Sequence, residues 1–138
     1  MTIIKISLVT ALAVIAASAS ATAEDTFHAV CANCHAKGVA NSPQVGDAAK
    51  WGPLIAEGQV IVTAHGYVGV RAMPPKGGQA DLTVQSFAEA LNYMVNKSGG
   101  NWRTPDKKMM RAIQTEIVAR QKLNAAKVSA SKVETLRQ

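Results

Sequence analysis

The sequence lacks the features of β-sheet, repeat and membrane-spanning proteins. No run of residues alternates between polar and apolar as a half-buried strand does, and no internal repeat is present. After the N-terminal segment, no stretch is apolar enough to cross a bilayer. We therefore expect an all-α fold without a membrane span in the mature chain.

Large aromatic residues are also scarce. The chain has only two phenylalanines, two tyrosines and two tryptophans. A front domain of about 70 residues, 24–96, can barely assemble a stable core from side chains alone. We therefore expect a bound group to fill part of its centre.

The first 23 residues have the composition of an export signal. Lys5 provides the positive charge, and the apolar run over 6–17 is too short to span a bilayer. The small residues Ala21 and Ala23 then fit the rule for signal peptidase cleavage. We expect residues 1–23 to be a signal peptide and the mature protein to be periplasmic and soluble; the alternative is a retained N-terminal anchor.

Charge divides the remaining chain into two parts. Residues 24–96 contain four basic and six acidic residues, a net charge of −2. Residues 97–138 contain ten basic and three acidic residues, a net charge of +7. The basicity of the protein therefore belongs to a C-terminal extension, and in an exported protein it does not indicate binding to nucleic acid.

Cysteine occurs only twice, as Cys31 and Cys34, and His35 follows directly. This C-x-x-C-H pattern is typical of covalent c-type haem attachment. A thioredoxin-like dithiol would need a strand before the motif, whereas the preceding residues read as the start of a helix. A zinc site would need four ligands, and the only other histidines are His28 and His65. The motif predicts one covalent haem c with His35 as an axial ligand of the iron.

The front domain should contain about three short helices. The first begins at Asp25 or Thr26, and the second covers about 53–65, where Gly58 weakens or divides it. The third is capped by Thr83 and carries apolar residues at three- and four-residue spacing.

Met73 is the predicted second axial ligand of the iron. It lies in the glycine-rich loop 66–78, and the two prolines after it stiffen the backbone and favour an extended conformation. The alternatives are Met73 as ordinary packing in a turn and His65 as a second histidine ligand, whereas Met94 should belong to the core.

Ligation by His35 and Met73 would leave no open position on the iron. A thioether favours Fe(II), so this pair raises the reduction potential. The combination is typical of a one-electron carrier and not of an enzyme. The alternatives are a haem enzyme or gas sensor with an open or labile sixth site, and a cytochrome subunit tethered to a larger complex by the basic extension.

The extension 97–138 should begin with a flexible linker, 97–101. We expect a helix that starts at Thr104 and runs towards Val128. Three interpretations remain open. The helix packs back on the front domain, burying Met110, Ile113 and Ile117, or docks on an acidic partner or an anionic membrane surface, or the segment is largely disordered.

The front domain resembles the bacterial cytochrome c5 family of small monohaem class I cytochromes. The matching pieces are Val30 to His35, Ser42 to Asp47, Trp51 to Ala56, Ala72 to Gly78, and Ala80 to Thr83 with Asn92 to Met94.

The resemblance implies a cytochrome c fold and periplasmic electron transfer between periplasmic or membrane-bound redox proteins. It makes Cys31 and Cys34 the thioether cysteines and His35 and Met73 the axial pair. It also implies that the Pro43 carbonyl accepts the ring N–H of His35 and that Phe27 meets Tyr93 where the first and last helices of the domain cross.

Trp51 has two possible roles under this resemblance. Its indole N–H either donates to a haem propionate, or the residue belongs to the core.

Two features depart from the family pattern. Gln79 stands where members commonly carry a cysteine of a further pair, and the basic extension has no counterpart. Loss of a disulfide typically costs a small domain about 2–5 kcal/mol, so we expect compensation elsewhere.

Overall fold

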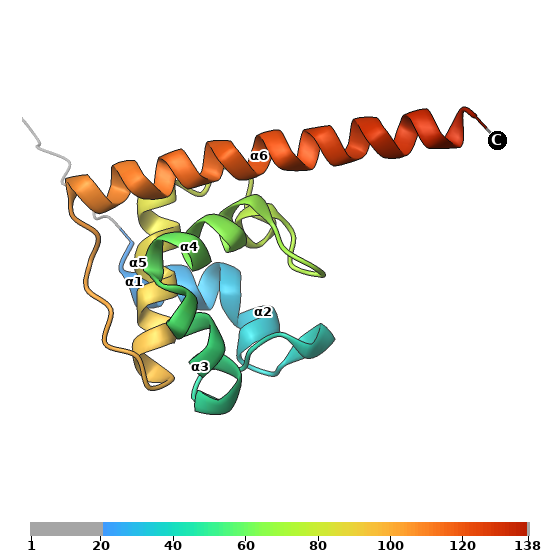
Figure 1. The fold of residues 1–138 in the computed structure, drawn as a ribbon. Coiled ribbons are helices and arrows are strands. Elements are labelled where there is room, and N and C mark those ends of the chain that lie inside the picture. Colours follow the sequence, from blue (N-terminus) through green and yellow to red (C-terminus); the bar gives the residue numbers. More distant parts are fainter. Residues whose placement is uncertain (1–20, 138) are drawn as a thin grey trace, which may run out of the picture.

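The computed structural model describes residues 21–137 and shows an all-α fold (Figure 1). The only β-type pairing in that range is an isolated bridge between Val70 and Met73. The predicted signal peptide lies, apart from its last three residues, outside the described residues. The α-helices are α1 (Ala23–Thr26), α2 (Ala32–His35), α3 (Ala48–Glu57), α4 (Gln59–Val68), α5 (Val84–Lys97) and α6 (Lys107–Thr135), and a π-helical turn, Phe27–Cys31, joins α1 to α2.

Helix α1 starts earlier than predicted, because Thr22 and not Asp25 or Thr26 is its N-cap. The Thr22 hydroxyl accepts the backbone N–H of Asp25 at 3.1 Å, and the Asp25 carboxylate accepts the backbone N–H of Thr22 at 3.0 Å. This reciprocal capping box satisfies two N–H groups that the helix itself leaves free. It also holds the pKa of Asp25 below its usual value, chiefly through the hydrogen bond from the Thr22 side chain.

The predicted second helix is two helices, α3 and α4, and Gly58 divides them as expected. Gly58 has a φ of +92°, a conformation that glycine adopts without the strain of a side chain. The start of α3 was predicted too late. Asp47 caps it by accepting the backbone N–H of Lys50 at 3.1 Å, so the helix already includes Trp51.

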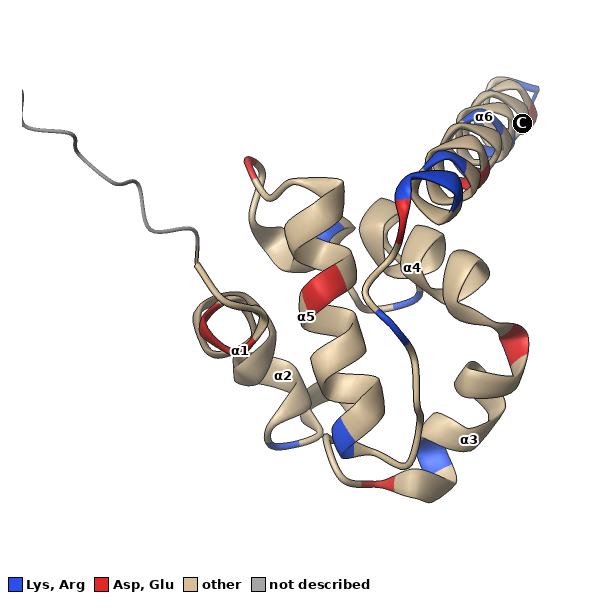
Figure 2. Ribbon diagram, turned by 90° about the vertical axis from the view of Figure 1, so that its left-hand side faces the viewer, with Lys and Arg blue, Asp and Glu red and all other residues tan. Residues whose placement is uncertain are grey.

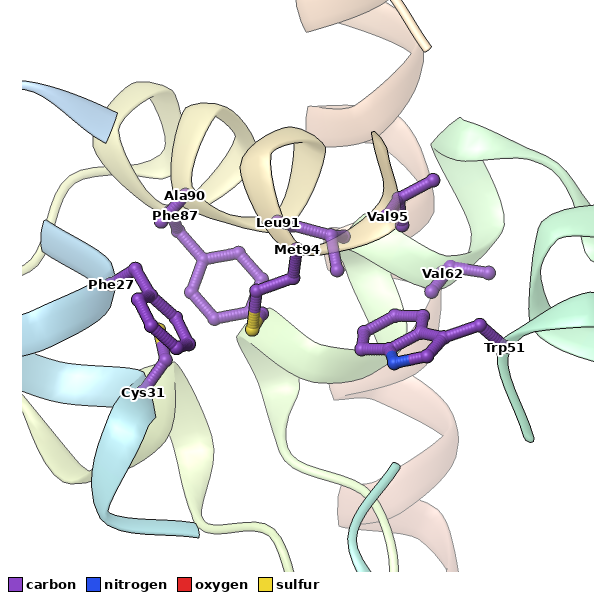
Figure 3. Close-up of a cluster of buried hydrophobic side chains, with 9 residues drawn as sticks. All are labelled: Phe27, Cys31, Trp51, Val62, Phe87, Ala90, Leu91, Met94 and Val95. Atoms are coloured by element: carbon purple, nitrogen blue, oxygen red, sulfur yellow. The ribbon is translucent and has the colours of Figure 1, made fainter. Parts of the chain in front are cut away.

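Helix α5 confirms the prediction made from its cap and its periodicity. The Thr83 hydroxyl accepts the backbone N–H of Ser86 at 3.1 Å, and Phe87, Leu91 and Met94 are buried along one side. Figure 3 shows these side chains facing those of the helices around them. The buried cluster comprises Phe27, Cys31, Trp51, Val62, Phe87, Ala90, Leu91, Met94 and Val95.

The first and last helices of the front domain meet through aromatic side chains. The rings of Phe27 and Tyr93 lie 5.3 Å apart between centroids, at an angle of 40°. The Tyr93 hydroxyl donates to the Glu24 carboxylate at 2.9 Å. Each aromatic ring thus contributes apolar area, while the polar end of Tyr93 remains hydrogen-bonded at the surface.

The segment between α5 and α6 includes 97–101, predicted as a flexible linker, and it is hydrogen-bonded to the helices beside it. Within 97–101, the buried Ser98 donates its hydroxyl to the Met94 carbonyl at 2.7 Å. The side chains of Asn92 and Gln59 both donate to the carbonyl of Arg103, at 2.6 and 2.8 Å. The Asn96 amide donates to the carbonyl of Trp102 at 2.9 Å and accepts its N–H at 2.7 Å. These contacts hold the segment against α5 and α4 and so fix where α6 begins.

Helix α6 starts at Lys107, later than predicted, because Asp106 and not Thr104 is the N-cap. The Asp106 carboxylate accepts the backbone N–H of Met109 at 2.7 Å, whereas Pro105 is buried before the helix begins. The helix reaches Thr135, beyond the expected end near Val128, and its 29 residues extend about 43 Å.

The first half of α6 packs on the front domain, as one of the three interpretations predicted. Ile113 and Ile117 are 0% and 1% exposed and contact Ala64 of α4. The second half projects beyond the other helices (Figure 1), and Leu123 and Val128 on it are 59% and 69% exposed. Figure 2 shows basic residues along α6. None of the described helices combines the length and apolar character needed to cross a membrane.

Candidate functional site

Both cysteines lie at the junction of the π-helical turn and α2. Cys31 ends the turn and is 5% exposed in the core cluster, whereas Cys34, three positions later, is exposed. Residues at this spacing lie on neighbouring turns of a helix and project from the same side. Both thiols are free in the structure. They can therefore bind two points on one edge of a planar group.

The pKa of the Cys31 thiol argues against the dithiol alternative. Burial raises this pKa to about 11. Redox-active cysteines work as thiolates, and their pKa values are usually lowered by nearby positive charge. At neutral pH Cys31 stays protonated, so it does not have the character of an attacking thiol.

The loop after α2 orients the imidazole of His35, which is 7% exposed. Its Nδ1 atom lies 2.8 Å from the carbonyl oxygen of Pro43, and because a carbonyl can only accept, Nδ1 carries the proton. The loop is tied back at two more points. Val45 donates its backbone N–H to the His35 carbonyl at 2.8 Å, and the Ser42 hydroxyl donates to the Cys34 carbonyl at 2.9 Å. Nε2 is left with a lone pair for a metal.

Met73 lies in a tight turn closed by two backbone hydrogen bonds. Its N–H donates to the Val70 carbonyl at 2.9 Å, and the Val70 N–H donates to the Met73 carbonyl at 3.1 Å. Within this turn Arg71 has a φ of +54°. A Cβ atom on Gly69 would lie 2.9 Å from the Pro75 nitrogen, so only glycine fits there. The half-buried Met73 side chain packs against the core cluster.

Gly66 of α4 leaves space for the Phe87 ring and the Met73 side chain. A Cβ atom on Gly66 would lie 2.8 Å from Cζ of Phe87 and 3.6 Å from Cε of Met73. The first distance is too short for two carbon atoms, so a side chain here would displace the Phe87 ring. This role of Gly66 was not predicted, because the residue was expected to be one of several glycines of a loop, whereas it belongs to α4.

His65, the alternative ligand, contacts Glu57 and lines a hollow at the surface. Its Nδ1 atom lies 3.4 Å from the Glu57 carboxylate, and the residue lines a surface hollow together with Arg71 and Arg120. Burial, followed by the positive charge of Arg120, lowers the pKa of His65 below its ordinary value. Met94, by contrast, is 2% exposed within the core, as predicted.

The indole N–H of Trp51, for which a haem propionate was one of two possible roles, has an acceptor within the protein. Its Nε1 atom donates to the Gln44 carbonyl at 2.9 Å, and its ring lies 6.1 Å from that of His35. This contact favours the alternative role in the core. The Gln44 side chain in turn donates to the carbonyl of Ala36 at 3.0 Å. Gln44 was not predicted as a site residue, and its one signal was its place in the loop after the cysteine motif.

The described residues fit a covalently bound haem c. Two free thiols are one helical turn apart, the adjacent imidazole presents Nε2, and a thioether lies in a stiff loop against the same apolar cluster that contains Cys31. This donor set, one nitrogen and one sulfur, is the pair found in cytochromes c.

Comparison with known proteins agrees with this fit. Residues 18–94 match the family model described as cytochrome c oxidase, cbb3-type, subunit III. Cytochrome c-555 of Chlorobaculum tepidum is 42% identical over 83 residues, which cover 57% of this chain and 77% of the relative. Cytochrome c5 of Ectopseudomonas mendocina is 35% identical over 74 residues, covering 52% and 85%.

A solved structure is similar in fold and in sequence. It is a chain in the crystal structure of an electron transfer complex of nitrite reductase with cytochrome c, with a TM-score of 0.53 and 37% identity, covering 55% of this chain and 93% of that one. The family match ends at residue 94, before α6 begins at Lys107. The chain therefore belongs to the class I monohaem cytochromes c, among which cytochromes c-555 and c5 are its relatives, and α6 is an extension beyond the matched region.

Proposed function

We propose that this cytochrome is a periplasmic one-electron carrier, and not an enzyme, with His35 and Met73 as the axial ligands of a single haem c. One observation carries the proposal most directly. The 2.8 Å contact between His35 Nδ1 and the Pro43 carbonyl fixes the tautomer that presents Nε2, next to the cysteine pair. The bound haem would supply a one-electron change between Fe(III) and Fe(II).

The residues of the chain hold this centre in one geometry. Cys31 and Cys34 would form the two thioether bonds, His35 would donate Nε2, and Met73 would donate its sulfur from the turn that Val70 closes. A carrier needs ligands that stay in place in both oxidation states. The hydrogen bonds on both ligand loops provide this restraint, because neither loop can move without breaking them.

The chain divides accordingly into residues 1–23 as a signal peptide, 24–96 as the haem domain and 97–138 as the extension. The structural neighbour forms an electron transfer complex with nitrite reductase. By analogy, the partners of this protein would be redox proteins, either in the periplasm or bound to the membrane.

Carbon monoxide binding tests the carrier against the alternative of an enzyme or gas sensor. A haem stain of the periplasmic fraction should first show that the haem is covalently bound and the protein exported. The reduced wild-type protein should then keep a low-spin spectrum under carbon monoxide without denaturant, because both axial positions are taken. A rapid spectral change on adding the gas would contradict the proposal.

The projecting half of α6 supports a docking role on an acidic partner. Lys132 is exposed on this half, and the exposed Arg137 follows the end of α6 at Thr135, whereas residues 24–96 carry a net charge of −2. Deletion of residues 128–138 leaves Ile113 and Ile117 in place. This variant should keep the spectrum of the wild type but exchange electrons with its partner more slowly and with a weaker dependence on salt. Unchanged rates across ionic strengths would exclude docking through this segment.

A further inference from the structure

A hollow of about 280 Å³ lies where three segments of the chain meet. Helix α4 contributes His65, the turn before Met73 contributes Arg71, and α6 contributes Arg120, Asn124 and Lys127. The hollow therefore exists only because the extension packs on the haem domain. Nothing in the haem-binding role requires it.

Cations outnumber the carboxylates that could neutralise them here. Arg120 Nε lies 2.8 Å from the Glu116 carboxylate, and His65 Nδ1 lies 3.4 Å from that of Glu57. Among residues 21–137, neither Arg71 nor Lys127 has an ion-pair partner. Arg71, Arg120 and Lys127 thus stand against the carboxylates of Glu57 and Glu116, which leaves the hollow with a net positive charge that attracts a negatively charged ligand.

The spacing of the α6 residues places their side chains on one face. Arg120, Asn124 and Lys127 follow at intervals of four and three, which continues the spacing of Ile113 and Ile117. The face of α6 that is apolar over α4 therefore becomes a row of hydrogen-bond donors over the hollow.

Arg71 is held in an unusual conformation at the opposite side. Its φ of +54° lies in the left-handed region, which residues other than glycine seldom adopt. The two hydrogen bonds between Val70 and Met73 maintain this turn. The backbone that carries Arg71 thus belongs to a turn closed by hydrogen bonds.

We propose that this hollow binds a phosphate-type oxyanion. The planar guanidinium of Arg71 suits two-point contact with the oxygen atoms of phosphate, Lys127 supplies a second positive charge, and the Asn124 amide a neutral donor. The excess of cations over carboxylates at the hollow favours an anion over a neutral ligand. Because its donors come from both the Met73 loop and α6, the bound anion also fastens the extension to the haem domain.

Calorimetric titration of the full-length holoprotein with inorganic phosphate tests the site, at an ionic strength held constant with sodium chloride. We expect binding of one phosphate per chain, at least tenfold weaker in Arg71→Gln and in Lys127→Gln. Lys132→Gln, on the projecting part of the same helix, is the matched control and should bind as the wild type does. The same absorption and circular dichroism spectra in all variants would show that each has folded.

Thermal unfolding provides a second measurement of the same site. A ligand that binds only the folded state raises Tm by mass action, so phosphate should raise Tm more than chloride at equal ionic strength. This increment should disappear in Arg71→Gln and persist in Lys132→Gln. No heat of binding, or an equal effect of chloride and phosphate on every variant, would overturn the proposal.

Sedimentation with vesicles distinguishes free phosphate from a lipid phosphate group. Cosedimentation with phosphatidylglycerol vesicles that Arg71→Gln abolishes would assign the site to a lipid headgroup. Binding of inorganic phosphate without cosedimentation would assign it to the free anion.

Discussion

The Nδ1 atom of His35 lies 2.8 Å from the carbonyl oxygen of Pro43. The two residues are eight positions apart, and the loop between them returns to α2 through the Ser42 hydroxyl, which donates to the Cys34 carbonyl at 2.9 Å. The backbone of one loop thus sets both the tautomer and the orientation of the imidazole. Because this geometry follows from the folded chain, the imidazole is already oriented for a metal by the protein itself.

Substitution of Gly66 tests how tightly the chain is packed beside Met73. A Cβ atom there would lie 2.8 Å from the Phe87 ring, so Gly66→Ala should lower the free energy of unfolding by about 1–3 kcal/mol through overpacking. Gly52→Ala is the matched control, because Gly52 is also helical and its Cβ would meet nothing within 4 Å. Denaturant unfolding of the two variants measures the difference, and equal stabilities would contradict the close contact.

The packing of α6 should compensate for the disulfide that the chain lacks at Gln79. Ile113 is fully buried against Ala64, so Ile113→Ala should cost about 2–5 kcal/mol of unfolding free energy. Leu123→Ala, on the exposed part of the same helix, should change it by no more than about 0.5 kcal/mol. If both variants unfolded at the same urea concentration, α6 would not contribute to the stability of the domain.

His65 should make stability depend on pH. Burial, then Arg120, lowers its pKa in the folded protein, while Glu57 partly opposes this shift. The unfolded chain therefore binds the proton more readily, and stability present above the ordinary histidine pKa of about 6.5 falls as the pH drops below it. Arg71 and Lys127 also line the hollow, and Glu116 pairs with Arg120, so the ring faces several charged groups.

Thermal unfolding of the wild type and of His65→Gln between pH 7.5 and pH 5 measures this contribution. The variant should lose less stability over that range than the wild type. Parallel curves would show that His65 titrates with the same pKa in the folded and unfolded states.

Helix α5 and the division at Gly58 were predictable because their signals are local. Thr83 precedes a regular apolar spacing, and Gly58 interrupts one. The predicted starts of α1 and α6 were wrong, because several nearby residues can cap a helix. Thr22 and Asp106 cap these helices in the structure, and each has another residue that can cap a helix within four positions.

The cysteine motif and Met73 could be singled out from the sequence as candidate site residues, because their residue types and spacing indicate a specific chemistry. The hydrogen bonds that hold the segment after α5 were not predicted, because they come from side chains distant in sequence. Its glycine and serine content suggested flexibility, whereas Gln59 reaches the carbonyl of Arg103 from 44 positions away. The acceptor of the Trp51 N–H was missed for a related reason, since it is a backbone carbonyl.

The reduction potential of Met73→Ala tests the proposed ligation most directly, with Met110→Ala as the matched control, because Met110 packs between α6 and α4. Loss of the Met73 thioether should lower the potential and open the iron to carbon monoxide, whereas Met110→Ala should keep both the potential and the low-spin spectrum of the wild type. A Met73→Ala protein with the wild-type potential and no carbon monoxide binding would contradict the assignment of Met73 as the second axial ligand.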